Sequence, residues 1–314
     1  MQKNQKPKPI RDLGLMRALI AKHKRFDSLF AILGIFVIAS LTVTLLILFI
    51  DLVIDGYPRF SIDFFGNFPS RRAARAGILS AWVGSSLVLV VTFLSAVPLG
   101  IAAGVYLEEY AKKNWLSDLI EINVSNLAGV PSIIYGLLAL GLFVYQFGLG
   151  QTILTAGLTL ALLMLPIVIV STREAIRAIP VHIREAAYAV GATKWQVCLQ
   201  HVIPYSYGGI LTGVIIGMAR AIGETAPIIT IGALTFIAFL PPSPVGLEAP
   251  FINFDWLNAG FTVLPIQMFN WISRPQLAFH MNAAATGAVI IMLTLLMNGA
   301  AIKIRYNIRK KIKW

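Results

Sequence analysis

Long runs of uncharged, mostly apolar residues dominate the pattern of this chain. The runs cover residues 29–50, 76–107, 126–172, 204–219 and 282–302. A helix needs about 20 apolar residues to cross the hydrocarbon core of a bilayer. The run 126–172 is long enough for two such helices, divided near Gly148, Gly150 and Gln151. The pattern therefore predicts an all-α polytopic membrane protein with six transmembrane helices.

The apolar stretch after the fifth run needs a separate interpretation, because it continues to Leu240. Pro227 should interrupt a helix there, and a second crossing by residues 228–240 would reverse the side of the basic C-terminal tail. We therefore expect this piece to be re-entrant or to pack at the outer surface. Residues 241–280 then form an outer loop. Within it, residues 265–275 predict a short interfacial helix, since Trp and Phe favour the headgroup zone.

Composition and charge agree with a membrane protein. The chain is 57% hydrophobic and 13% charged, whereas soluble domains carry about 25% charged residues. Its net charge of +12 is concentrated in the two tails, which argues against a nucleic-acid partner and favours charges that set topology. The predicted cytoplasmic segments 1–26, 108–125, 173–203 and 303–314 hold 20 of the 26 Lys and Arg residues, against five in the outer segments. The positive-inside rule thus predicts that both termini are cytoplasmic.

The chain lacks the sequence signatures of an enzyme. Its single cysteine, Cys198, excludes an internal disulfide and should face the cytoplasm, and its four histidines are too scattered for a metal motif. No Walker A sequence, GxSxG elbow or HExxH motif occurs. We therefore expect no catalytic residue, no metal and no bound cofactor, and any ATP chemistry must come from a partner.

A loop between the fourth and fifth predicted spans carries the first recognisable motif. Glu185, Ala186 and Ala187 are followed by Gly191 and, thirteen residues later, by Pro204. Small alanines allow close approach of another protein, and Gly191 permits a turn between two short helices. The segment resembles the EAA loop of ABC-transporter permeases, although it ends His-Val-Ile-Pro where that family has Ile-x-Leu-Pro. The resemblance implies that Glu185, Ala186, Ala187 and Gly191 contact an ATPase; the alternative is an ordinary cytoplasmic hairpin.

Two charged residues interrupt the fifth apolar stretch. Arg220 and Glu224 are four positions apart, so they share a helical face and can form an ion pair. An arginine at the centre of a transmembrane helix costs about 2.5–3.5 kcal/mol, and such residues usually face a cavity, a partner or a substrate. Gly213, Gly217 and Gly223 keep the surrounding helix slim, which leaves room for another helix or an ion. The pair is either structural or part of a path for an oxyanion.

Three segments refine the resemblance. The sequences ARAIGETAP, LAGVPSIIYG and TVLPIQMFNWISRPQ are similar to those of phosphate permeases of the PstA type. The resemblance implies a MetI-like permease core and a place for Arg220, Glu224 and Thr225 on the substrate path. It further implies a multi-pass subunit of a bacterial inner membrane, within membrane lipid. Its partners would be a PstC-type permease, two PstB-type ATPase subunits that use ATP and Mg, and a PstS-type phosphate-binding protein.

The expected organisation follows from these features. Residues 1–75 form a basic cytoplasmic tail, a first span and an outer loop; residues 76–304 form the permease core, with the EAA loop at 173–203; residues 305–314 form a basic tail. The outer cluster Arg71, Arg72 and Arg75 is either a solvated loop or an attractor for anions or an acidic protein face. Alternatives to a PstA-type permease are a PstC-type partner, a sulfate or molybdate permease, and a passive anion channel that needs no ATPase.

Overall fold

The computed structural model describes residues 13–245 and 251–311, and the chain divides into two compact units at Asp51 and Leu52. The first part of the predicted N-terminal tail, the end of the C-terminal tail and residues 246–250 of the predicted outer loop lie outside the described residues. Within the described ranges the chain is helical, without a β-strand. The predicted all-α fold is therefore confirmed.

The first unit, residues 1–51, consists in its described part of one helix, α1, Leu13–Gly56, which continues into the second unit. Between Phe26 and Ile50 its side chains are exposed on nearly every face, although they are almost all apolar. A helix that is apolar all round matches lipid surroundings. The predicted first span falls inside this stretch.

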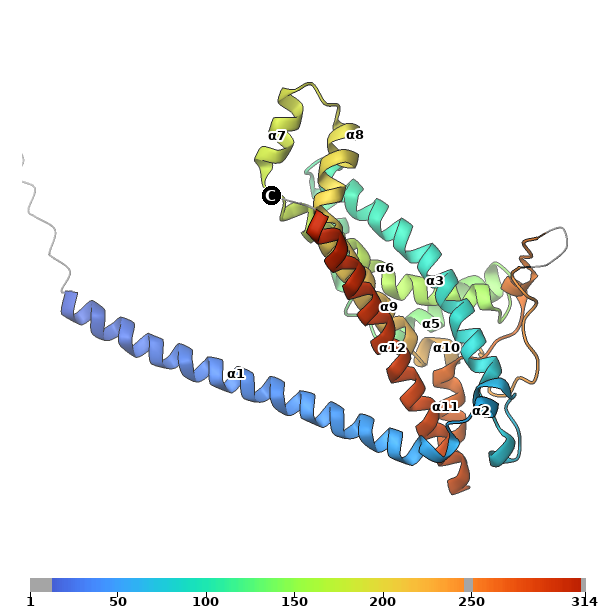
Figure 1. The fold of residues 1–314 in the computed structure, drawn as a ribbon. Helices are drawn as coiled ribbons and strands as arrows, with labels where there is room; N and C mark the ends of the chain where they lie inside the picture. The colour runs from blue at the N-terminus through green and yellow to red at the C-terminus, as the bar shows by residue number, and fades with distance from the viewer. Residues whose placement is uncertain (1–12, 246–250, 312–314) are drawn as a thin grey trace, which may run out of the picture. The chain divides into compact units, whose positions relative to one another are not determined.

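The second unit, residues 52–314, is a bundle of long helices with short helices at both ends (Figure 1). In its core, α6 packs between α3 and α9, while α12 packs against α9 and α11. Its elements after α1 are η1 Tyr57–Arg59, α2 Ile62–Gly66, η2 Ala73–Arg75, α3 Leu79–Val105, η3 Tyr106–Tyr110, α4 Trp115–Leu127, α5 Ser132–Ala139, η4 Leu140–Gln146, α6 Ile153–Arg177, α7 Val181–Ala189, α8 Lys194–Val197, η5 Cys198–Val202, α9 Ile203–Gly223, α10 Ala226–Thr230, η6 Asp255–Asn258, α11 Leu264–Ile272 and α12 Leu277–Lys311.

Glycines bring the core helices into close contact. On α9, a Cβ at Gly213 would meet the side chain of Ser171 in α6, and one at Gly217 would meet Met164 at 2.6 Å. On α3, a Cβ at Gly100 would lie 2.7 Å from Val168 of the same helix α6. Small residues allow backbones to approach in this way. The slim surface that the sequence predicts on α9 therefore receives α6 of the same chain.

The spans agree with the prediction except for the third. Five helices are long and apolar enough to cross a membrane, and a bent pair, Trp115–Leu127 with Ser132–Gln146, gives a sixth if it counts as one span. The two parts of this pair meet at 106°. The third predicted span is therefore bent near its start, because a new helix begins after Pro131, beyond the turn at Gly129. The predicted division at Gly148 and Gly150 is confirmed, since both adopt positive φ.

Among its described residues, the segment between α9 and α11 contains no helix long enough to span a membrane. Residues 228–240 contribute only the end of α10 and irregular backbone, so the rejected second crossing is indeed absent from this stretch. The expected helix near residues 265–275 is present as α11. Its interfacial position stays a prediction: Trp271 is 0% exposed, with its ring centroid 6.1 Å from that of Phe64, whereas Phe269 is 54% exposed.

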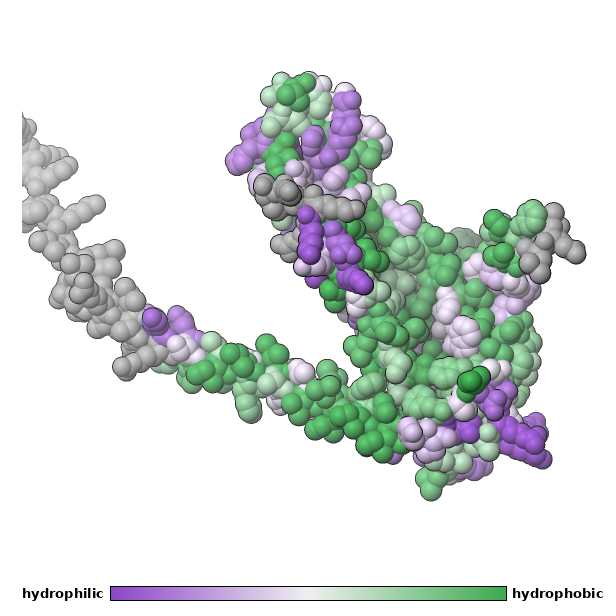
Figure 2. Space-filling model, in the orientation of Figure 1, coloured by the Kyte–Doolittle hydropathy of each residue, from purple (hydrophilic) through white to green (hydrophobic). Residues whose placement is uncertain are grey.

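Hydrophobic side chains cover the middle of the second unit, and hydrophilic ones gather at its two ends (Figure 2). One hydrophilic end contains α7 and α8, and the other lies near α2. The C-terminal end of α12 lies at the α7–α8 end. This distribution is the one a bilayer imposes on a spanning bundle.

Candidate functional site

The predicted EAA loop forms a hairpin of two short helices. Pro180 precedes α7, and Gly191 makes the turn after it with a φ of +86°, a conformation that favours glycine. The Gly191 N–H donates to the carbonyl of Tyr188 at 2.9 Å. Thr193 then caps α8 through a capping box with Gln196. The predicted hairpin with its turn at Gly191 is confirmed.

The hairpin has a buried base and an exposed tip. Ala187 is buried with Ile176 and Val197, whereas Glu185 and Ala186 are exposed. Val190 and Trp195 are 85% and 66% exposed, and Gly191 has open space around the position of a Cβ. Large apolar side chains on an otherwise polar projection are typical of a surface that binds another protein.

The second arm of the hairpin is continuous with a span. Helices α8, η5 and α9 form one run from Lys194 to Gly223 of 30 residues. On the other side, α6 extends to Arg177. Both neighbouring helices therefore extend into residues 173–203, so the predicted loop contains the end of α6 and the start of the run that leads into α9. Cys198, which we expected on the cytoplasmic side, lies inside this run and is only 2% exposed, so its thiol is poorly accessible to a reagent.

The predicted pairing of Arg220 and Glu224 is confirmed. The Arg220 Nε donates to Glu224 Oε1 at 2.9 Å, with side chains 36% and 15% exposed. Arg220 stands in the last turn of α9, and Glu224 follows in extended backbone as its C-cap residue. Within the described parts of the chain, the terminal nitrogens of Arg220 make no hydrogen bond. They remain open to an acceptor that enters beside the pair.

Glu224 and Thr225 face different spaces. Glu224 lines a cavity of about 10 Å³ together with Ser85, Leu160 and Ile228. Thr225 lines a nearly apolar pocket of about 570 Å³, whose wall is formed by Gly223 and by residues of α10, α11 and α12. The sequence groups Arg220, Glu224 and Thr225 on one path, and the structure brings only the first two together.

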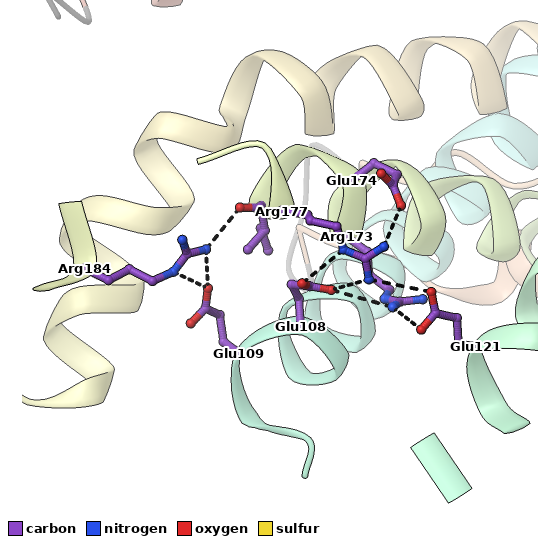
Figure 3. Close-up of polar contacts among 8 residues, drawn as sticks. Glu108, Glu109, Glu121, Arg173, Glu174, Arg177 and Arg184 are labelled. Atoms are coloured by element: carbon purple, nitrogen blue, oxygen red, sulfur yellow. Dashed lines mark hydrogen bonds and ion pairs between the residues drawn. The ribbon is translucent and has the colours of Figure 1, made fainter. Parts of the chain in front are cut away.

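Sequence reasoning missed a cluster of charged side chains at the hairpin end of the bundle (Figure 3). It joins η3 at the end of α3, the middle of α4 and the end of α6 to α7, the first arm of the hairpin. The sequence did contain a signal for this cluster. Glu108 directly follows the apolar run 76–107, and Arg173 directly follows the run 126–172. The members are Glu108, Glu109, Glu121, Arg173, Glu174, Arg177 and Arg184. Neither in this cluster nor elsewhere among the described residues do three or more acidic, Cys or His side chains form a group suited to a metal ion.

Comparison with known proteins agrees with this architecture. Residues 96–312 match the family model described as binding-protein-dependent transport system inner membrane component. The chain is 32% identical to a probable ABC transporter permease, YqgI, of Bacillus subtilis, over 84% of this chain and 90% of that protein. It is 34% identical to the phosphate transport system permease protein PstA of Mycobacterium leprae, over 72% and 70% of the two chains.

A solved structure shares the fold. The MetNI methionine ABC transporter, in an inward-facing conformation, superposes with a TM-score of 0.54 at 18% identity, covering 72% of this chain and 94% of that one. The predicted MetI-like core is thus confirmed at the level of fold. The resemblance to PstA-type permeases is confirmed as well, and the chain belongs to the family of inner-membrane components of binding-protein-dependent transport systems.

Proposed function

We propose that this permease carries phosphate, as the PstA-type half of a transmembrane heterodimer in a bacterial inner membrane. The observation that carries the proposal is the similarity to a PstA protein over 72% of the chain, which includes the Arg220–Glu224 segment. The other half is a PstC-type permease, and a PstS-type protein delivers phosphate from outside. Both termini are cytoplasmic. The chain itself binds no cofactor.

The hairpin is the site at which the ATPase acts. Two PstB-type subunits bind ATP and Mg beneath the membrane, and one receives the tip of α7 and α8. The exposed Glu185 and Ala186 and the turn at Gly191 meet the ATPase, while Ala187 fixes the base of the hairpin. Because the second arm is continuous with α9, a movement of the tip reaches the bundle directly.

Arg220 provides the charge that an anion needs in an apolar surrounding. A guanidinium offers donors in a planar fork that fits the oxygens of a tetrahedral oxyanion. Glu224 occupies only the Nε of this fork, so the two terminal nitrogens of Arg220 remain available to bind phosphate. The ion pair also lowers the cost of keeping both charges among apolar helices.

The test is transport by the purified complex. The chain is reconstituted in liposomes with its PstC-type permease, the ATPase and the binding protein, and labelled phosphate uptake is measured with and without ATP. We expect uptake that requires both ATP and the binding protein and that excess sulfate or molybdate does not reduce. Uptake of sulfate or molybdate in preference to phosphate would contradict the substrate, and ATP-independent flux would indicate a passive channel.

A further inference from the structure

The π-helical turn η3, at the end of α3, contacts three different elements through three consecutive side chains. Glu108 pairs with arginines of α6. Glu109 pairs with Arg184 of α7. The ring of Tyr110 lies 4.8 Å from the Nζ of Lys194 in α8, in cation–π geometry. Both arms of the hairpin are therefore tied to neighbouring residues of one turn.

The contact to the first arm is the stronger of the two ties. Arg184 donates to Glu109 Oε1 from Nη2 at 2.8 Å and from Nε at 3.0 Å. Further N–H groups of the same guanidinium donate to the carbonyls of Ile176 and Ile179, each at 3.0 Å. One side chain thus joins α7, the end of α6 and the end of α3. The side chains of Arg184 and Glu109 are only 19% and 10% exposed.

The neighbouring carboxylate extends the network into the bundle (Figure 3). Glu108 accepts from Arg177 through both oxygens, at 3.1 and 3.3 Å. Arg173, which is 5% exposed, lies 3.6 Å from Glu108 and 2.6 Å from Glu121 of α4. Its Nε has no hydrogen-bond partner within the described residues. A donor that is free in this arrangement can take a new acceptor when the helices shift.

We infer that η3 is the junction through which displacement of the hairpin reaches α3, and through Glu108 also α6 and α4. The inference rests on the proposed function. Its physical basis is that separating a largely buried ion pair leaves desolvated charges without a partner. The first arm packs mainly against α8 and η5, so Arg184 is its polar tie to the spans. Glu109 and Tyr110 are positioning residues, and neither touches substrate or ATP.

The test removes both ties from the η3 side. In Glu109→Gln with Tyr110→Leu, Arg184 keeps its bonds to the two carbonyls and position 109 keeps a neutral acceptor. We expect the complex to retain its ATPase and to hydrolyse ATP. The phosphate transported per ATP hydrolysed should fall about tenfold, within the usual range of coupling between sites. A purely structural role would lower the amount of complex and leave this ratio unchanged.

Two controls match the double variant. Glu174→Gln removes an exposed carboxylate of the same cluster whose only ion pair in the described chain, with Arg177, stays within α6. Tyr110→Phe keeps the aromatic face toward Lys194. Both should transport with the ratio of the unsubstituted complex. If the double variant does not fold, the phosphate transported per ATP hydrolysed is measured in the single variants Glu109→Gln and Tyr110→Leu instead, and a lower ratio in either supports the inference.

The outcomes separate this inference from the proposed function. An unchanged ratio in the double variant would show that the motion passes elsewhere. Loss of the ATPase on purification would also overturn the inference, because the two contacts would then only support docking. Absence of phosphate transport in the unsubstituted complex would instead contradict the proposed function, whatever the variants do.

Discussion

The Arg220–Glu224 pair shows what sequence can and cannot reveal about single residues. Two charges four positions apart in an apolar run predict their own pairing, because the contact is local. The pair between Glu109 and Arg184 spans 75 positions, and it forms only because α3 and α7 meet in the fold. Contacts of this second kind depend on tertiary packing, which no periodicity encodes.

Neutralising both charges of the first pair separates its two interpretations. In Arg220→Gln with Glu224→Gln, no unpaired charge remains, so assembly and ATP hydrolysis should stay near normal. Phosphate uptake should fall at least about tenfold, because a site that loses its charged hydrogen bonds forfeits about 1.5–3 kcal/mol for each. The measurement is labelled uptake in proteoliposomes.

The matched control is Arg305→Gln, which removes another arginine that bonds to α9, at Thr212. It should leave the affinity for phosphate unchanged. Uptake by the double variant close to that of the unsubstituted protein would mean that the pair is structural, and Arg220 would no longer count as a site residue.

At the scale of elements, the length and hydropathy of the apolar runs predict most helices, but they do not predict where the chain bends between two helices. Five of the expected spans are single helices, because a long apolar run has few other stable forms in lipid. The bend of 106° before Ser132 was missed, because the uncharged run 126–172 continues through it without interruption. The turn signals Gly129 and Pro131 stand at the break and would have located it.

Two glycines of α9 allow a test of the helix contact. Gly213 faces Ser171 of α6, whereas the Cβ position of Gly208 is open. We expect Gly213→Ala to destabilise the protein by about 1–3 kcal/mol through overpacking. Gly208→Ala should be neutral or stabilising by up to about 1 kcal/mol, as in other helix interiors. Thermal unfolding in detergent compares the two, and equal midpoints would contradict the close contact.

The hairpin turn can be tested independently of the spans. In Gly191→Pro the fixed φ of proline conflicts with +86°, and the N–H that bonds to Tyr188 is lost. The variant should insert normally but lose the ATPase during purification. Gly191→Ala, with a strain of about 1–2 kcal/mol, should show a weaker form of the same defect. Full retention of the ATPase by Gly191→Pro would exclude the turn from the interface.

At the scale of the whole molecule, the two hydrophilic ends of the second unit define its axis in the membrane. The sequence predicts this polarity through the unequal distribution of Lys and Arg, because those residues resist translocation. It also predicts that the hairpin and the end of α12 share one end, because both segments are assigned to the cytoplasm. It does not predict which helices pack against one another, such as α6 between α3 and α9.

Orientation is tested with new cysteines in a Cys198→Ala background. Val190→Cys lies on the exposed hairpin tip, and Arg71→Cys lies at the opposite, exposed end. In the subunit without its ATPase, an impermeant thiol reagent should label Val190→Cys only in inside-out vesicles and Arg71→Cys only in intact spheroplasts. The reverse pattern would overturn the proposed topology.

The continuity of α8, η5 and α9 has a mechanical consequence. Gly213, wedged against α6, divides this rod into a segment of about 28 Å toward Lys194 and one of about 10 Å toward Arg220, at 1.5 Å per residue. If this rod pivots at Gly213, it acts as a lever with two arms of unequal length. A shift of about 3 Å at the hairpin would then move the guanidinium by about 1 Å in the opposite direction. Hydrogen bonds form within a range of about 0.5 Å, so under the proposed function one tilt would suffice to switch Arg220 between holding and releasing phosphate.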